Sequence, residues 1–88
     1  MDYIKKINKI IKILEDSNEM ESANMIKMTL EESFTYTEIL MKVTYNLKLI
    51  LKKNITLKEL IENDVDELIK YCKSIGLQIS SSPKSKLK

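Results

Sequence analysis

Two helix starts follow each other in residues 34–60, FTYTEILMKVTYNLKLILKKNITLKEL. In each of them a threonine stands three residues before a glutamate, as Thr35 before Glu38 and Thr56 before Glu59. This is the spacing of a capping box, in which the threonine hydroxyl accepts a hydrogen bond from the glutamate N–H and the carboxylate accepts one from the threonine N–H. The segment therefore predicts two consecutive helices, each of which begins directly after its threonine.

Apolar residues flank both capping boxes and predict a hydrophobic staple at each start, Phe34 with Ile39 and Ile55 with Leu60. We expect the two helices to cover residues 36–53 and 57–75. The residues expected on their inward faces are Tyr36, Leu40, Val43, Leu47, Ile50 and Leu51, then Leu57, Leu60 or Ile61, Val65, Leu68, Cys72 and Ile75. Gly76 is suited to the left-handed conformation that ends a helix, and Leu77 would then pack back on the last turn.

Two further helices are expected upstream, at residues 2–16 and 18–32. Asp2 is a suitable N-cap for the first. For the second, either Asn18 with Glu21 or Asp16 with Glu19 has the spacing of a cap. The apolar spacing places inward Ile4, Ile7, Ile11 and Leu14 in the first helix, with Ile10 at the flank, and Met20, Ala23, Ile26 and Leu30 in the second.

Short connections between four amphipathic helices favour antiparallel neighbours, so the predicted fold is an all-α antiparallel four-helix bundle. The chain of 88 residues contains one Gly and one Pro, too few for the turns of a β-rich fold. This length suits one domain. We expect the bundle domain to cover residues 1–79 and the Ser- and Lys-rich residues 80–88 to be a disordered tail.

Residue types needed for most catalytic and metal sites are missing. The chain has no His, and its only Gly cannot form a phosphate-binding loop. Cys72 lies on an inward helix face and is interpreted as core, and the carboxylates around Glu62 as a solvated helix face. We therefore predict that the protein is not an enzyme and uses no cofactor or metal. Without a signal peptide or membrane span, a cytoplasmic location is expected.

The outer faces of the second and third helices carry apolar residues that a surface helix does not need. These residues are Met25, Met28, Met41, Tyr45 and Leu49. Glu31, Glu32 and Glu38 lie near them in the sequence. We interpret the eight residues as a partner-binding site, because Met-rich surfaces adapt easily to a partner. The alternative is that these helices are more central and that the apolar residues belong to the core.

Charge is unevenly distributed along the chain. From Glu15 to Glu38 there are seven acidic residues and only Lys27. An acidic region beside an apolar patch suits a basic protein partner. Nucleic-acid binding is disfavoured, because all 15 basic residues are Lys and residues 1–79 carry a net charge of −1. Membrane binding is also not expected, since the Ile stripe of the first helix is better used in the core.

The segment Phe34-Thr35-Tyr36-Thr37-Glu38-Ile39-Leu40-Met41, with Leu47 after it, resembles a helix start of small helical immunity proteins. Such proteins are encoded beside bacterial toxin systems, including contact-dependent inhibition. The resemblance implies a cytosolic protein that binds and neutralises a cognate toxin domain. Two alternatives stay open: a homo-oligomeric structural or regulatory bundle that uses the same patch as its dimer interface, and a phage or plasmid accessory protein associated with nucleic acid.

Overall fold

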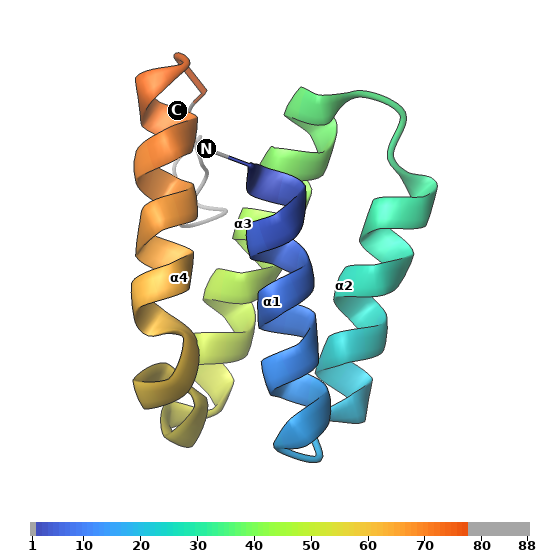
Figure 1. The fold of residues 1–88 in the computed structure, drawn as a ribbon, viewed down its shortest axis with the longest axis vertical. Coiled ribbons are helices and arrows are strands. Elements are labelled where there is room, and N and C mark those ends of the chain that lie inside the picture. Colours follow the sequence, from blue (N-terminus) through green and yellow to red (C-terminus); the bar gives the residue numbers. More distant parts are fainter. Residues whose placement is uncertain (1, 78–88) are drawn as a thin grey trace, which may run out of the picture.

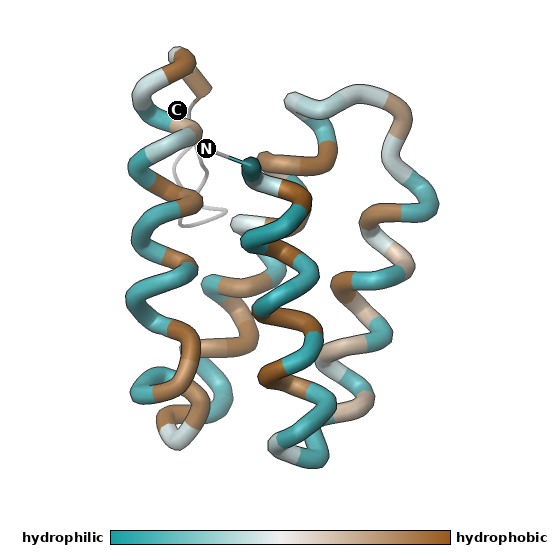
Figure 2. Tube along the Cα trace, in the orientation of Figure 1, coloured by the Kyte–Doolittle hydropathy of each residue, from teal (hydrophilic) through white to brown (hydrophobic). Residues whose placement is uncertain are grey.

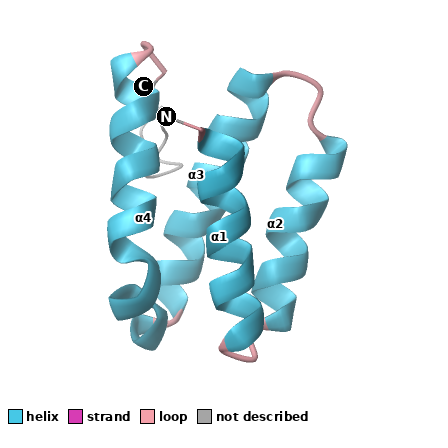
Figure 3. Ribbon diagram, viewed as in Figure 1, coloured by secondary structure: helices cyan, strands magenta, loops and turns pink. Residues whose placement is uncertain are grey.

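The computed structural model describes residues 2–77, which form the predicted antiparallel four-helix bundle. The helices are α1 (Tyr3–Asp16), α2 (Met20–Glu32), α3 (Tyr36–Lys53) and α4 (Ile55–Ser74). Successive helices run in opposite directions and are joined by short loops (Figures 1 and 3). Each helix packs against two neighbours, because α4 returns to α1 and closes the ring. The tail expected at residues 80–88 lies outside the described residues.

A continuous apolar core lies between the four helices and receives side chains from all of them. Along α1 and α4, apolar and polar residues alternate with the helical repeat, which turns one side of each helix toward the core (Figure 2). The buried apolar residues are Ile7, Ile10, Ile11, Leu14, Ala23, Ile26, Leu40, Val43, Leu47, Ile50, Leu57, Ile61, Val65, Leu68 and Cys72. Ile10 thus belongs fully to the core, and Ile61 rather than Leu60 is the inward residue of its turn.

Four residues expected on inward faces are instead exposed: Ile4, Met20, Tyr36 and Ile75. Each stands at the end of a helix or one residue from it. A residue at a helix end has a turn of its own helix on only one side along the axis. The neighbouring helices also cover such a residue less completely than one in the middle of the helix. Helical spacing predicts the face of the helix on which a residue lies. It does not predict whether the neighbouring helix is long enough to cover a residue at the end.

The start of α3 agrees with the prediction in its cap but not in its staple. The Thr35 hydroxyl accepts a hydrogen bond from the Glu38 N–H at 3.2 Å, as expected. The Glu38 carboxylate, however, accepts from the N–H of Phe34 at 2.9 Å and not from that of Thr35. The predicted staple of Phe34 with Ile39 is wrong, since the Phe34 side chain is 92% exposed.

The predicted start of α4 at Thr56 is wrong, because Asn54 takes the capping position. The Asn54 side-chain oxygen accepts a hydrogen bond from the Thr56 N–H at 3.1 Å, and the helix begins at Ile55. Asn54 also ends α3, so a single residue joins the two helices and Thr56 already lies inside α4. The staple of Ile55 with Leu60 does not form either, because both side chains are exposed, Ile55 by 78%.

Neither predicted cap begins α2, since Asn18 is used to end α1. Asn18 adopts a left-handed conformation with φ of 62°. The Glu19 N–H then reaches back to the Leu14 carbonyl oxygen at 2.8 Å, which is the hydrogen bond of a Schellman motif. The helix consequently begins at Met20, two residues later than predicted, and its N-cap Glu19 makes no side-chain capping bond.

The predicted end of α4 is confirmed. Gly76 has a φ of 86°, and the Leu77 N–H donates to the Cys72 carbonyl oxygen at 2.8 Å. Leu77 packs against the core, as expected. A glycine meets this conformation without the steric cost that a side chain would add.

Each of the four contacts between neighbouring helices contains at least one polar interaction. Lys27 of α2 pairs with Glu15 of α1. Asn46 of α3 donates to the Thr29 hydroxyl of α2 at 3.1 Å, and Thr44 of α3 lies 3.8 Å from the sulfur of Cys72 in α4. The fourth interaction joins α1 to α4 and is ionic.

The ionic interaction between α1 and α4 is centred on Asp64, a buried carboxylate that the apolar pattern does not predict. Lys6 and Lys9 donate hydrogen bonds to the same Asp64 oxygen at 3.0 and 3.2 Å, and Lys6 also pairs with Glu67 at 2.6 Å. Burial alone would raise the pKa of the Asp64 carboxyl, but the hydrogen bonds and charges of Lys6 and Lys9 outweigh it and hold this pKa below 3.8. Glu67 first, and then Asp64, raise the pKa of Lys6 above 10.5.

We expect Asp64→Asn to lower the free energy of unfolding near neutral pH, because it leaves two ammonium groups facing a neutral side chain. A carboxyl with a lowered pKa stabilises the fold above its unfolded pKa of about 3.8 and loses this effect as the pH falls through its folded value. Urea unfolding should therefore show the variant approaching wild type in acid. Asp66→Asn, which changes an exposed carboxylate without an ion pair among residues 2–77, is the control. Equal effects of both substitutions would contradict the role of Asp64.

Candidate functional site

Apolar side chains line the outer faces of α2 and α3, on the side of these helices that faces away from the core. Met25, Met28, Met41 and Leu49 are between 36 and 54% exposed, and Tyr45 is half-buried. We call these five residues the Met/Tyr stripe. Because the core contains none of them, the bundle does not need them for its own packing.

Helical spacing explains why the α3 part of the stripe is continuous. Met41, Tyr45 and Leu49 are four residues apart, so each lies about one turn after the previous one on the same side of the helix. Leu40, Val43, Leu47 and Ile50 form the buried row on the opposite side. The same helix therefore presents one apolar row to the core and a second to its surroundings.

Two shallow hollows between α2 and α3 show which predicted site residues come together. The first, of about 350 Å³, lies between Met25 of α2 and Leu49 of α3 and also borders Glu19 and Glu21. The second, of about 240 Å³, is bordered by Glu32, Lys42 and Tyr45 and has Thr29 and Asn46 at its floor. Met25, Tyr45 and Leu49 thus border the groove between the two helices, with Glu32 beside Tyr45. Met28 and Met41 are exposed but border neither hollow.

Of the three predicted acidic residues, Glu31 lies away from this groove and Glu38 is paired with a lysine. Glu31 lies one helical turn after Lys27, which reaches toward α1 to pair with Glu15, so Glu31 is on the α1 side of α2. Glu38 is engaged at the start of α3. A hydrogen bond from Lys42 at 2.7 Å, followed by the one from the Phe34 N–H, lowers the pKa of the Glu38 carboxyl.

The charge around the stripe is therefore divided between two sides. On the α2 side it is acidic, from Glu21 and Glu32, because Lys27 is paired with α1. On the α3 side Lys53 borders the groove, and Lys42 borders it too, although Lys42 is paired with Glu38. The sequence segment with many acidic residues does not form an acidic ring around the apolar patch.

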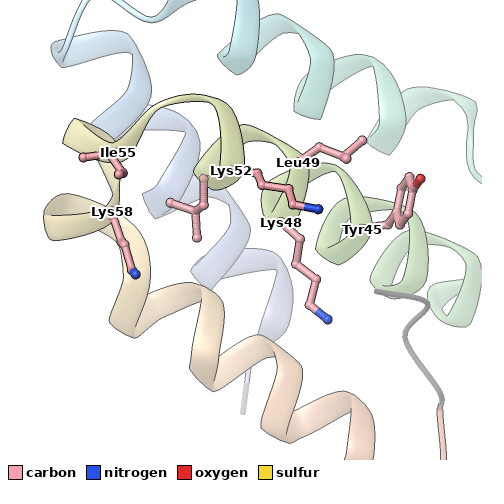
Figure 4. Close-up of a pocket in the computed structure, with 7 residues that line it drawn as sticks. Tyr45, Lys48, Leu49, Lys52, Ile55 and Lys58 are labelled. Atoms are coloured by element: carbon pink, nitrogen blue, oxygen red, sulfur yellow. The ribbon is translucent and has the colours of Figure 1, made fainter. Parts of the chain in front are cut away.

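Sequence reasoning missed a third hollow, which lies on the other side of Tyr45 where α3 meets α4 (Figure 4). Its volume is about 430 Å³, and three lysines line it together with apolar side chains. Its lining residues are Tyr45, Lys48, Leu49, Leu51, Lys52, Ile55 and Lys58. The i, i+4 spacing of Lys48 and Lys52 is visible in the sequence, but their proximity to Lys58 depends on the one-residue turn at Asn54.

Cys72, the free thiol of the bundle, is buried beside Thr44 in the core. Burial raises the pKa of this thiol, which disfavours the reactive thiolate. Among residues 2–77, no three side chains of His, Cys, Asp or Glu gather into a group that could hold a metal ion. None of the four helices is long and apolar enough to cross a membrane.

Comparison of the chain with protein-family models, with curated proteins and with solved structures finds no match.

Proposed function

We propose that this protein binds a protein partner through the Met/Tyr stripe, and that the partner is a bacterial toxin domain that it neutralises. The observation that supports binding is the stripe itself, five exposed or half-exposed apolar residues that the closed core does not use. Exposed apolar patches of this kind are typical of interaction sites. The toxin as partner comes from the resemblance of residues 34–47 to helical immunity proteins.

The composition of the stripe suits a tight protein contact. Three of its five residues are Met, whose flexible side chains adapt to the shape of a partner. Tyr45 adds an aromatic ring with a polar end, and tyrosine is enriched among the residues that dominate binding energy. It borders the hollows on both sides of α3 and so occupies the middle of the contact area.

Charge on the α2 side specifies part of the partner. Glu21 and Glu32 border the groove, and both side chains are exposed. A partner that covers the stripe would therefore place basic residues opposite α2, where complementary charges guide association and fix orientation.

Complex formation with the product of a neighbouring gene is the direct test. The two purified proteins are mixed and the affinity is measured by calorimetry, and cells that produce the neighbouring protein are tested for protection when this chain is also produced. Absence of a complex together with absence of protection would exclude the proposal. Light scattering of the chain alone shows whether it forms a homodimer. If it does, and if the stripe forms the dimer interface, the partner is a second copy of the chain and not a toxin.

Glu32 and Glu31 form a matched pair for testing the α2 side, because they are adjacent in sequence but lie on different sides of the helix. We expect Glu32→Lys to slow association with a basic partner about tenfold at low salt and to weaken its salt dependence. Glu31→Lys makes the same charge change on the α1 side and should have a much smaller effect. Stopped-flow association rates over a range of salt concentrations would show the difference, and equal effects would mean that only net charge matters.

A further inference from the structure

The hollow where α3 meets α4 combines apolar side chains with three lysines. Leu51 is half-buried and packs against the core, while Ile55 is exposed at the turn. Figure 4 shows Lys48 and Lys52 extending from α3 and Lys58 from the first turns of α4, with Tyr45 on the part of α3 farther from the α3–α4 turn. We call this site the lysine hollow.

Most of its positive charge is not neutralised within the bundle. Among residues 2–77, no carboxylate lies within 4.0 Å of the ammonium group of Lys48 or Lys52, whereas Lys6 and Lys42 both have partners. Lys58 faces Glu62 at the long distance of 3.8 Å, an exposed pair that contributes little. An occupant with negative charge would therefore find three lysines beside the apolar side chains of Leu51 and Ile55.

The shape of the hollow favours a protein segment over a small molecule. Its walls are α3 and the first turns of α4, so the side away from the bundle is open. A small ligand usually buries 70% or more of its surface in its site, which an open hollow does not offer. A protein segment, in contrast, covers its own outer side. Tyr45 and Leu49 belong to both the lysine hollow and the Met/Tyr stripe, so a protein on the stripe extends into the hollow.

We propose that the lysine hollow binds an acidic segment of the protein partner, with an apolar side chain on Leu51 and Ile55 and carboxylates at Lys48, Lys52 and Lys58. This inference rests on the proposed function and refines it, because the partner must then be basic opposite α2 and acidic opposite the α3–α4 turn. Such opposite charges on the two sides of one stripe allow only one orientation of the partner.

The hollow can be tested without the natural partner. An amphipathic peptide of Leu, Ala and Glu is titrated into the ¹⁵N-labelled full chain at low salt, beside a peptide in which every Glu is Gln. We expect the Glu peptide to bind about tenfold more tightly than the Gln peptide, because it can form three exposed charge pairs with the lysines. The changes in amide chemical shift should be concentrated in residues 45–58. Substituting Lys48→Gln, Lys52→Gln and Lys58→Gln together should reduce the preference to about twofold.

The control variant carries Lys5→Gln, Lys70→Gln and Lys73→Gln, an equal loss of charge at exposed lysines outside the hollow. It should keep the preference for the Glu peptide. An equal loss in both triple variants, or amide shifts elsewhere in the bundle, would overturn the proposal. So would 1-naphthoate binding as tightly as the peptide, because the site would then suit a small anion.

The two proposals can fail separately. If the natural partner binds and the Lys48, Lys52 and Lys58 variant binds it as tightly as wild type, the lysine hollow is wrong and the stripe stands. If the peptide result is obtained but no partner complex or protection is found, the hollow stands and the proposed function is wrong. Far-UV circular dichroism of both triple variants verifies that they are folded.

Discussion

Replacing Leu47 by Ala is expected to lower the free energy of unfolding by about 2–5 kcal/mol. Leu47 is fully buried in the middle of α3, where α3 packs against both α2 and α4. The substitution removes apolar contacts and leaves a cavity that the three helices can close only in part. Since a small domain is stable by about 5–15 kcal/mol, this is a large part of the total. Urea unfolding followed by circular dichroism measures the loss.

Leu49→Ala is the matched control, because it makes the same chemical change two residues away on the outer side of α3. Leu49 is 36% exposed and lies outside the core, so we expect a change in the free energy of unfolding of about 0.5 kcal/mol or less. The same variant should weaken partner binding, which Leu47→Ala would affect only through unfolding. If Leu49→Ala were as destabilising as Leu47→Ala, the Met/Tyr stripe would be part of the core and not a binding surface.

Tyr45→Ala is expected to weaken binding of the partner by about 2 kcal/mol or more, which corresponds to about thirtyfold in the dissociation constant. The ring borders two hollows on opposite sides of α3, so a partner that covers the stripe encloses it from both sides. Side chains enclosed in this way at the centre of an interface contribute most to affinity. Calorimetry with the purified partner would measure the loss, and unfolding of the free variant would separate it from a loss of stability.

Tyr36→Ala serves as the control for the loss of a tyrosine from the same helix. Tyr36 is exposed at the start of α3, where its ring lies 6.5 Å from that of Tyr3 and not in the stripe. We expect its removal to leave the affinity within about twofold of wild type. A similar loss from both substitutions would mean that the contact is spread over the whole helix or lies at the other end of the bundle.

The lysine hollow and the α2 side of the groove together change what is expected of the partner. In the sequence, the acidic stretch from Glu15 to Glu38 suggests a partner that is basic over its whole contact surface. In the fold, Lys27 pairs with α1 and Lys42 pairs with Glu38, while Lys48, Lys52 and Lys58 gather around the α3–α4 turn. The partner that fits this surface carries both signs of charge, arranged on two sides of an apolar contact.

Features that depend on a few neighbouring residues could be derived from the sequence. The start of α3 follows from the Thr35 cap, and the end of α4 follows from Gly76. Both rest on hydrogen bonds between groups at most five residues apart. The central buried residues of each helix, such as Leu47 and Leu68, follow from spacing alone, because two neighbouring helices cover the inward side of each helix there.

The start of α4 shows where such local reasoning fails. Thr56 and Glu59 have the spacing of a capping box, but Asn54 caps the helix first. Asn54 also donates to the Glu19 carboxylate at 3.1 Å, a contact that joins the α3–α4 turn to the start of α2. Two local solutions were available to the chain, and a contact between residues 35 positions apart favours the one that is observed.

The sequence by itself determined that this chain forms four amphipathic helices with an apolar row on the outer side of the third. Helical hydrogen bonds and side-chain spacing act within one or two turns, so residue order is sufficient to specify them. Only the tertiary structure decided that Glu31 lies toward α1 while Glu32 borders the groove with α3. It also decided that Asp64 is buried between Lys6 and Lys9 and that three lysines line one hollow. These features depend on how the helices are placed beside one another, and that placement results from packing the whole core at once.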